Sequence, residues 1–151
     1  MKKILMLNIK TAVVLYVLVD IICAGAGMGV PIFCVLLGFP TGWYIARKAT
    51  ASREELYQKN YKILKFSLLA AIFTFIVMLI VWGSAILIHI HSVSDIQNFG
   101  HPNILYDPVT SFIGWLILMI IVSPFLQLLT SIFAAFITVI RNEKRLQHQS
   151  I

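Results

Sequence analysis

The sequence FSLLAAIFTFIVMLIVWGSAILIH, residues 66–89, decides the fold class. It contains no Asp, Glu, Lys or Arg, and it exceeds the roughly 20 apolar residues that a helix needs to cross about 30 Å of hydrocarbon. A second uncharged run occupies residues 109–140, and a third stretch, residues 11–46, contains Asp20 as its only charged residue. These runs predict helices that span a membrane.

The composition agrees with this interpretation. Hydrophobic residues make up 60% of the 151 residues and charged residues only 12%, whereas soluble domains have about 25% charged residues. The mean hydropathy is +0.91. A chain with so few polar side chains cannot cover a globular surface with them. We therefore expect a single membrane domain over residues 1–151, and no soluble domain.

The stretch 11–46 is too long for one crossing. At 1.5 Å per residue it would make a helix of about 54 Å, well beyond the thickness of the hydrocarbon. Gly25, Gly27, Gly29 and Pro31 disfavour a continuous helix, and the chain is expected to turn there. This stretch therefore predicts two helices joined by a tight turn.

The complete prediction is an all-α integral membrane bundle of four transmembrane helices. The expected helices cover residues 5–24, 30–47, 65–90 and 109–140. Pro40 is expected to interrupt the second helix, which is short, and Pro124 to kink the fourth, because proline removes a backbone hydrogen bond.

The distribution of basic residues predicts the orientation. All 12 Lys and Arg fall into three clusters: Lys2, Lys3 and Lys10; Arg47, Lys48, Arg53, Lys59, Lys62 and Lys65; and Arg141, Lys144 and Arg145. With four crossings all three clusters lie on one side, whereas the turn at 25–31 and the outer loop at 91–108 carry neither Lys nor Arg. The positive-inside rule then places both termini and the basic loop at 48–64 in the cytoplasm.

The same clusters account for the net charge of +6. The expected partner of the protein is the lipid bilayer, with anionic lipid bound at the basic loop, and nucleic acid is not expected as a partner. Within the loop, the stretch that begins near Ser52 has the composition of a surface helix. Its residues either contact lipid headgroups or form a solvated linker, and both alternatives stay open.

The first helix has some features of a cleaved signal peptide, because two lysines precede an apolar stretch. Lys10 and Asp20 interrupt that pattern, and we expect the helix to be retained. Cys23 and Cys34 flank the predicted turn without forming a metal-binding motif. They are expected to be packing residues, with a disulfide between them as the alternative.

Small and polar residues mark the faces on which membrane helices pack, because lipid does not distinguish among apolar side chains. In the second helix Gly38, Gly42 and Ala46 recur every fourth residue and predict its packing face. The other helices carry similar stripes: Asn8, Ala12, Tyr16, Asp20 and Ala24; Ser67, Ala71, Thr74, Met78 and Ala85; Ser123, Gln127, Ser131, Ala134 and Thr138.

Asp20 is the only acidic residue within a predicted span, which makes it the first candidate for a functional site. Tyr16, one turn away, and His89, at the outer end of the third helix, are its candidate partners. Hydration near the outer surface is the alternative. Gln127 is expected either to bind the carbonyl freed by Pro124 or to form a hydrogen bond across helices.

The outer loop contains several residue types that bind metals. His89, His91 and His101 are weak candidates for a metal site, together with Asp95 and Asp107. Their spacing matches no known metal motif, and no catalytic or cofactor-binding motif is present anywhere in the sequence. We therefore expect no cofactor and no catalytic residues, and lean away from an enzyme.

Three functions are consistent with this sequence. The leading hypothesis is a small multi-pass protein of the cell membrane that acts through helix–helix contacts with a membrane partner or with its own copies. The first alternative is an oligomeric transporter or channel that uses Asp20. The second alternative is a membrane enzyme with a His/Asp site at its outer face.

Overall fold

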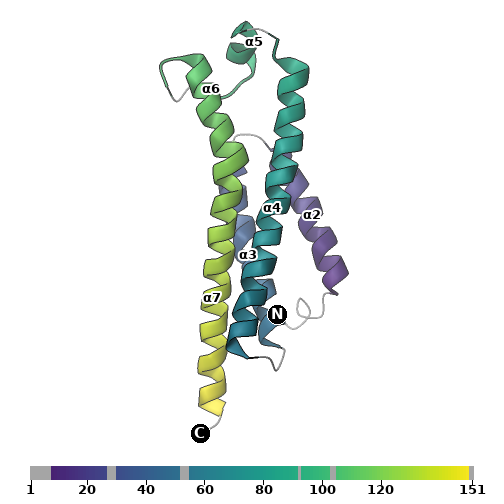
Figure 1. Cartoon of the computed structure of the whole chain (residues 1–151), viewed down its shortest axis with the longest axis vertical. Helices are drawn as coiled ribbons and strands as arrows, with labels where there is room; N and C mark the ends of the chain where they lie inside the picture. The colour runs from purple at the N-terminus through teal and green to yellow at the C-terminus, as the bar shows by residue number, and fades with distance from the viewer. Residues whose placement is uncertain (1–7, 27–29, 52–54, 92, 103–104, 150–151) are drawn as a thin grey trace.

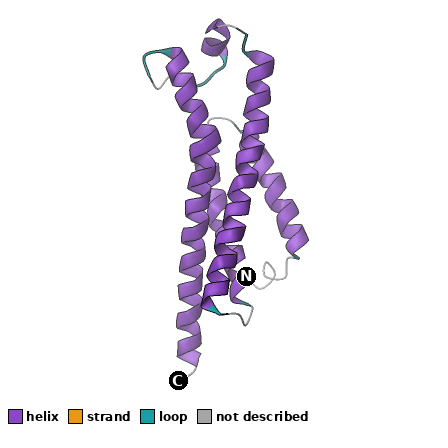
Figure 2. Cartoon of the chain, in the orientation of Figure 1, coloured by secondary structure: helices purple, strands orange, loops and turns teal. Residues whose placement is uncertain are grey.

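A computed structural model describes residues 8–26, 30–51, 55–91, 93–102 and 105–149. The side chains of these residues are also described, except at positions 93, 94 and 143–149. Every secondary-structure element in these ranges is helical (Figures 1 and 2). In chain order they are α2 (Ile9–Gly25), α3 (Val30–Thr50), α4 (Leu56–His89), α5 (Val93–Asn98), α6 (Pro108–Ile117), the π-helical segment η2 (Leu118–Val122) and α7 (Ser123–Gln149).

Within the described ranges, three helices are long and apolar enough to cross a membrane. They are α3, α4 and the continuous helix formed by α6, η2 and α7, with mean hydropathies of 1.3, 2.6 and 2.3 in their most apolar windows. The described part of the first predicted helix, α2, has 17 residues, or about 26 Å. Its predicted start at residue 5 lies outside the described residues. The fold is therefore an all-helical bundle with at least these three candidate spans.

The connection between α3 and α4 differs from the prediction. The basic loop was expected at 48–64, but α3 continues to Thr50 and α4 already begins at Leu56. The start of the predicted surface helix, at Ser52, lies outside the described residues. The physical reason is that a helix need not end where the apolar run ends: Lys59, Lys62 and Lys65 are good helix formers and extend α4 beyond the uncharged stretch.

Pro40 does not interrupt the second helix, contrary to expectation. The helix α3 runs through it without a break. The neighbouring Thr41 hydroxyl donates to the Leu37 carbonyl at 2.7 Å, which adds a hydrogen bond within the turn that proline disturbs. Such side-chain bonds are a known way for membrane helices to tolerate proline.

Pro124 is accommodated by a widened turn. The segment η2 lies directly before it, and there the Ser123 amide and hydroxyl both donate to the Leu118 carbonyl, the hydroxyl at 2.8 Å. A π-turn shifts the hydrogen-bond pattern by one residue, so the missing proline N–H falls at a place where the pattern already changes. As a result α6, η2 and α7 follow one another as a single long helix (Figure 1).

The most extensive helix contact is between α3 and α7. Gly38 and Gly42 are buried, and a Cβ atom on Gly42 would collide with the backbone of Ser131. The Ser131 hydroxyl donates to the Gly38 carbonyl at 3.1 Å. Glycine at these two positions therefore lets the two backbones approach closely enough for a direct hydrogen bond.

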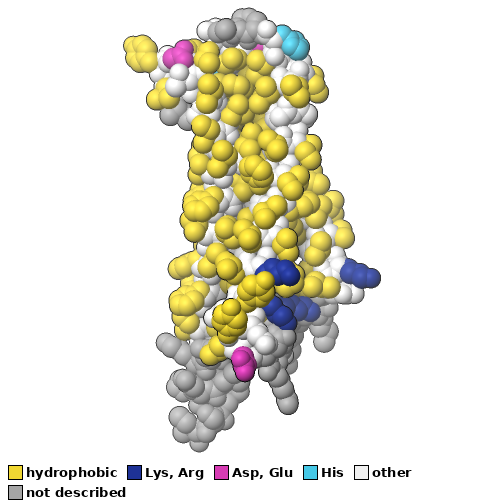
Figure 3. Space-filling model, in the orientation of Figure 1, with side chains coloured by type: hydrophobic (Ala, Val, Ile, Leu, Met, Phe, Trp, Pro, Cys, Tyr) yellow, Lys and Arg dark blue, Asp and Glu magenta, His cyan; other side chains and the backbone are white. Residues whose placement is uncertain are grey.

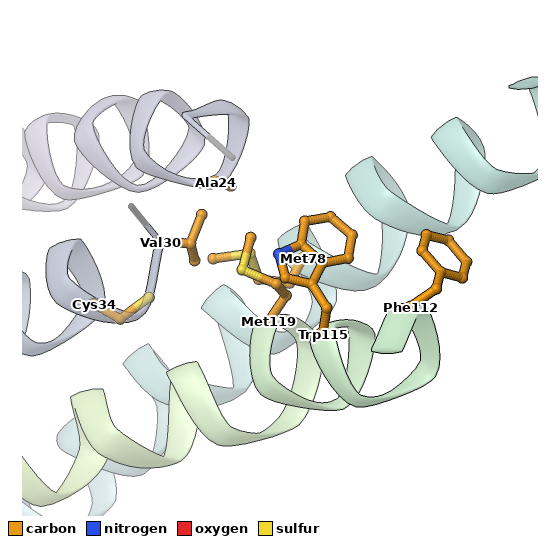
Figure 4. Packing of buried hydrophobic residues seen from close by; sticks show 7 residues of the cluster. All are labelled: Ala24, Val30, Cys34, Met78, Phe112, Trp115 and Met119. Carbon is orange, nitrogen blue, oxygen red and sulfur yellow. The ribbon is translucent and has the colours of Figure 1, made fainter. Parts of the chain in front are cut away.

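Toward the end near α5, a hydrophobic cluster joins α2, α3, α4 and the helix formed by α6 and η2 (Figure 4). Its buried members are Ala24, Val30, Cys34, Met78, Phe112, Trp115 and Met119. Cys34 belongs to this cluster and Cys23 is partly buried, and both thiols are free. The two cysteines therefore form no disulfide and serve as packing residues.

The surface is apolar along most of its length (Figure 3). On the face shown, Lys and Arg side chains gather toward the end where α3 meets α4 and His lies at the opposite end, whereas acidic side chains appear at both ends. Large hydrophobic side chains are exposed on every long helix, including Ile22, Ile32, Ile80 and Phe136. Such a surface suits lipid rather than water.

The close contact of α3 and α7 yields a test with a matched control. Gly42→Ala should lower the free energy of unfolding by about 2 kcal/mol or more, because the new methyl group meets backbone that cannot move aside. Gly83→Ala places the same methyl group where no atom lies within 4 Å. It should be neutral or raise stability by up to about 1 kcal/mol through helix propensity. Thermal unfolding in detergent measures both, and equal effects would contradict the α3–α7 packing.

Candidate buried polar site

Asp20 is buried inside the bundle, with 1% of its surface exposed. It lies in the last third of α2, on the face that also carries Tyr16 and Ala24, because residues four apart share one side of a helix. The Thr74 hydroxyl, from α4, donates to Asp20 Oδ1 at 2.8 Å. The carboxylate is thus oriented by a neutral partner on a neighbouring helix.

The contact extends into a chain of four side chains from three helices. The Tyr16 hydroxyl lies 2.8 Å from Thr74 Oγ1, and Gln127 Nε2 on α7 donates to the Tyr16 oxygen at 2.7 Å. Gln127 and Thr74 are fully buried and Tyr16 is partly buried. These hydrogen bonds connect the second turn of α7 to the carboxylate of α2 through Thr74 of α4.

The number of hydrogens gives the chain a direction when Asp20 is ionised. Thr74 has one hydroxyl hydrogen, and the ionised carboxylate can only accept, so that hydrogen points to Asp20. The Thr74 oxygen can then accept from Tyr16, whose own oxygen accepts from Gln127. The Ala70 carbonyl offers an alternative acceptor, 2.9 Å from the Tyr16 oxygen and 3.2 Å from the Thr74 oxygen.

Two oxygens of this site have no hydrogen-bond partner although they are buried: Asp20 Oδ2 and Gln127 Oε1. Leaving a neutral buried group unpaired costs about 1–3 kcal/mol, and leaving a charged one unpaired costs more. Buried atoms of this kind generally mark a bound water, an ion or a functional proton. Both free atoms are acceptors, so the site is complementary to a donor or a cation.

No basic side chain neutralises Asp20 within the part of the chain that the structure describes. Its one hydrogen-bond partner there is Thr74, and the other two side chains of the hydrogen-bond network, Tyr16 and Gln127, are neutral. The Cys23 and Cys34 thiols also lie within electrostatic range of the carboxylate. The Lys and Arg residues visible in Figure 3 lie toward the other end of the molecule.

Of the four residues predicted for this site, the fold brings three together: Tyr16, Asp20 and Gln127. His89 lies at the exposed end of α4, fifteen residues after Thr74, or about 22 Å along the helix. It is therefore too far away to be the partner of Asp20. Gln127 binds across helices to Tyr16 rather than to the carbonyl freed by Pro124.

Thr74 is the site residue that the sequence did not single out. It appeared only as a member of the small-residue stripe on α4, because threonine is a common packing residue in membrane helices. Its hydroxyl meets Asp20 through the relative register of α2 and α4, which are separated by 54 positions in sequence at this contact. A sequence stripe defines a face but does not determine which residues of two faces meet.

Among the described residues, His89, His91 and His101 do not form a common site. His89 and His91 are exposed, whereas His101 is 8% exposed and packs against Phe112, with ring centroids 5.2 Å apart. Both ring nitrogens of His101 lack a partner. No three His, Cys, Asp or Glu side chains among the described residues come together to hold a metal ion.

Asp107 has a structural role at the start of α6. Its carboxylate accepts from the Thr110 amide at 2.8 Å and from the Thr110 hydroxyl at 2.6 Å, which makes it the N-cap of the helix. These hydrogen bonds from Thr110 lower the pKa of Asp107 below its usual value. The residue is exposed and stays ionised at neutral pH.

Comparison with known proteins finds no matching family model, no matching curated protein and no matching solved structure. The function must therefore be argued from the site itself.

The hydrogen-bond chain predicts a specific cost for losing the Tyr16 hydroxyl. Tyr16→Phe leaves Gln127 Nε2 and the Thr74 oxygen without this partner, and should lower stability by about 1–3 kcal/mol. Tyr57→Phe removes the same hydroxyl from a side chain that is 79% exposed, and should have almost no effect. A double-mutant cycle with Gln127→Leu should show coupling, and strict additivity would mean that the two groups do not interact.

Proposed function

We propose that this chain is a four-span protein of the cell membrane that moves a cation across the bilayer as an oligomer, with Asp20 as the cation-binding group. The observation that carries this proposal is the buried carboxylate with one free oxygen and no basic partner among the described residues. An ionisable group is costly at such depth, and it usually serves a substrate, ion or proton pathway.

The interior of α7 supports the same proposal. Ser123, Gln127, Ser131 and Thr138 are buried on the side of α7 that faces the bundle. Helix packing alone requires small side chains but not so many hydroxyl and amide groups. The three hydroxyls donate to backbone carbonyls, whereas Gln127 keeps a free Oε1, an acceptor of the kind that a cation needs within hydrocarbon.

In this proposal α2 is the fourth crossing. Its 17 residues are at the short end of the lengths observed for transmembrane helices. The face of α2 that points away from the bundle carries exposed Leu15, Leu18 and Ile22. In Figure 1, α2 begins toward the end where α3 meets α4. If α2 crosses the membrane, the three clusters of Lys and Arg therefore lie on the same side of it. The positive-inside rule then supports a cytoplasmic location for that end.

The two other hypotheses receive less support. The partner-contact hypothesis relied on small-residue faces, but the face formed by Gly38, Gly42 and Ala46 is occupied by α7 of the same chain. The enzyme hypothesis relied on the outer histidines and aspartates, which are spread over exposed and buried positions. Binding of a separate membrane partner would have to use other surfaces, such as the exposed apolar side of α2.

The topology can be tested by cysteine accessibility in a background where Cys23 and Cys34 are replaced by Ala. Cysteines introduced at Lys59 and Gln147 should react only with reagents that reach the cytoplasm, and one at Asn98 only with an external, membrane-impermeant reagent. Labelling of positions 59 and 98 from the same side would contradict the four-span topology.

Transport can be tested in liposomes that contain the purified protein and a trapped indicator dye. With imposed H⁺, Na⁺ or K⁺ gradients, the wild-type protein should accelerate the flux of at least one cation. Asp20→Asn should reduce that flux at least tenfold, because it removes the charge while preserving the shape. Asp107→Asn, which alters an exposed carboxylate but keeps a good N-cap, should retain it. Equal flux through both variants, or no flux through the wild type, would contradict the proposal.

A further inference from the structure

We infer that the cation bound by the Asp20 site is a proton, and that the Thr74–Tyr16–Ala70 hydrogen bonds exist in two arrangements that accept it without movement of the heavy atoms. This inference rests on the proposed function for the idea that Asp20 is the working group. It adds the identity of the ligand and the means by which the site holds it.

In the ionised arrangement, hydrogens point toward Asp20. Thr74 donates to Asp20 Oδ1 at 2.8 Å and Gln127 donates to Tyr16 at 2.7 Å. Tyr16 donates either to Thr74 at 2.8 Å or to the Ala70 carbonyl at 2.9 Å. Every hydroxyl hydrogen in the chain therefore has an acceptor.

In the protonated arrangement, a proton from water forms an O–H bond on Asp20 Oδ1 and this group donates to the Thr74 oxygen over the same 2.8 Å contact. The Thr74 hydrogen turns to the Ala70 carbonyl, which lies 3.2 Å away. The Ala70 carbonyl accepts this hydrogen beside its helical bond from the Thr74 amide, and the two lone pairs of the Thr74 oxygen accept from Asp20 and from Tyr16 together. Release breaks the Asp20 O–H bond, returns the proton to water, and restores the first arrangement.

The geometry favours a proton over a metal cation. A hard metal ion takes about six oxygen ligands, whereas the Asp20, Thr74 and Tyr16 oxygens are already joined to one another at 2.8 Å. Among the described oxygens of this site, only Asp20 Oδ2 and Gln127 Oε1 are free. A proton needs no additional ligands, and it converts the unpaired Oδ2 from a charged atom into a carbonyl oxygen, for which burial costs less.

The groups around Asp20 allow it to titrate alone. The titratable groups that face it are Tyr16 and Cys23 from α2 and Cys34 from α3, all of which are neutral in their protonated forms. The nearest polar groups from α4 and α7 are Thr74 and Gln127, which do not titrate. One proton therefore neutralises the described site completely.

Infrared difference spectroscopy of the purified protein, recorded as the pH is changed, tests this inference. The wild type should show a carboxylic-acid carbonyl band that disappears as the pH rises, and Asp20→Asn should lack it. Asp107→Asn should keep the band, because that exposed carboxylate belongs to the α6 cap. The exposed carboxyl groups contribute the same bands to both spectra, so identical pH-dependent carboxyl bands in the wild type and in Asp20→Asn would overturn the inference.

Thr74 provides a second test that does not depend on the folding of the Asp20 variant. Thr74→Val removes the hydroxyl with little change in shape, and should shift the midpoint of the carboxyl titration by about one pH unit or more. Thr74→Ser keeps the hydroxyl and should leave the midpoint close to that of the wild type. Equal midpoints in all three proteins would show that Thr74 does not bond to the titrating group, and would overturn the two-arrangement mechanism.

The outcomes for the inference and for the proposed function can be told apart. A titrating Asp20 in a protein that shows no cation flux supports proton binding and contradicts transport. Asp20-dependent flux of Na⁺ or K⁺ without a titrating carboxyl supports transport and overturns the assignment of the proton.

Discussion

The close approach of α3 to α7 is the constraint on which the bundle depends. Where Gly42 faces Ser131, no side chain separates the two backbones, and the Ser131 hydroxyl reaches the Gly38 carbonyl. Dispersion and short hydrogen bonds drive helix association in lipid, where the hydrophobic effect does not act between helices. The α3–α7 pair therefore provides a rigid base against which α4 and α2 pack, and its position sets where Gln127 points.

The polar chain depends on that base. Gln127 lies between Ser123 and Ser131 on the buried side of α7, so the contact that holds Ser131 against α3 also fixes the amide that meets Tyr16. Tyr16 then positions Thr74, and Thr74 positions the carboxylate. The 17-residue helix α2 carries the buried Asp20, and the network holds that helix against α4.

Much of the fold was predictable from sequence because lipid imposes simple rules. Long uncharged runs predicted the helices, and the residues around Gly25 predicted the turn, since these signals are local. The start of α4 was misplaced because helix-forming residues extend it beyond the apolar run. The continuous helix through Pro40 and the π-segment before Pro124 were not predictable, because each depends on hydrogen bonds that form only in the folded chain. In the site, burial cost alone marked Asp20, whereas its contact with Thr74 depends on helix register and His89 was an incorrect choice of partner.

The widened turn at η2 also affects the rotational phase of the longest helix. Buried residues recur there every fourth position: Trp115, Met119, Ser123, Gln127, Ser131 and Ala135. In a regular α-helix such a series drifts around the axis by about 40° at each step, because four residues exceed one turn of 3.6. A π-turn contains more residues than an α-helical turn, so it rotates the following residues back and opposes that drift. The hydrophobic cluster near α5 and the polar side chains around Gln127 can therefore face the same neighbours although they lie on opposite sides of Pro124.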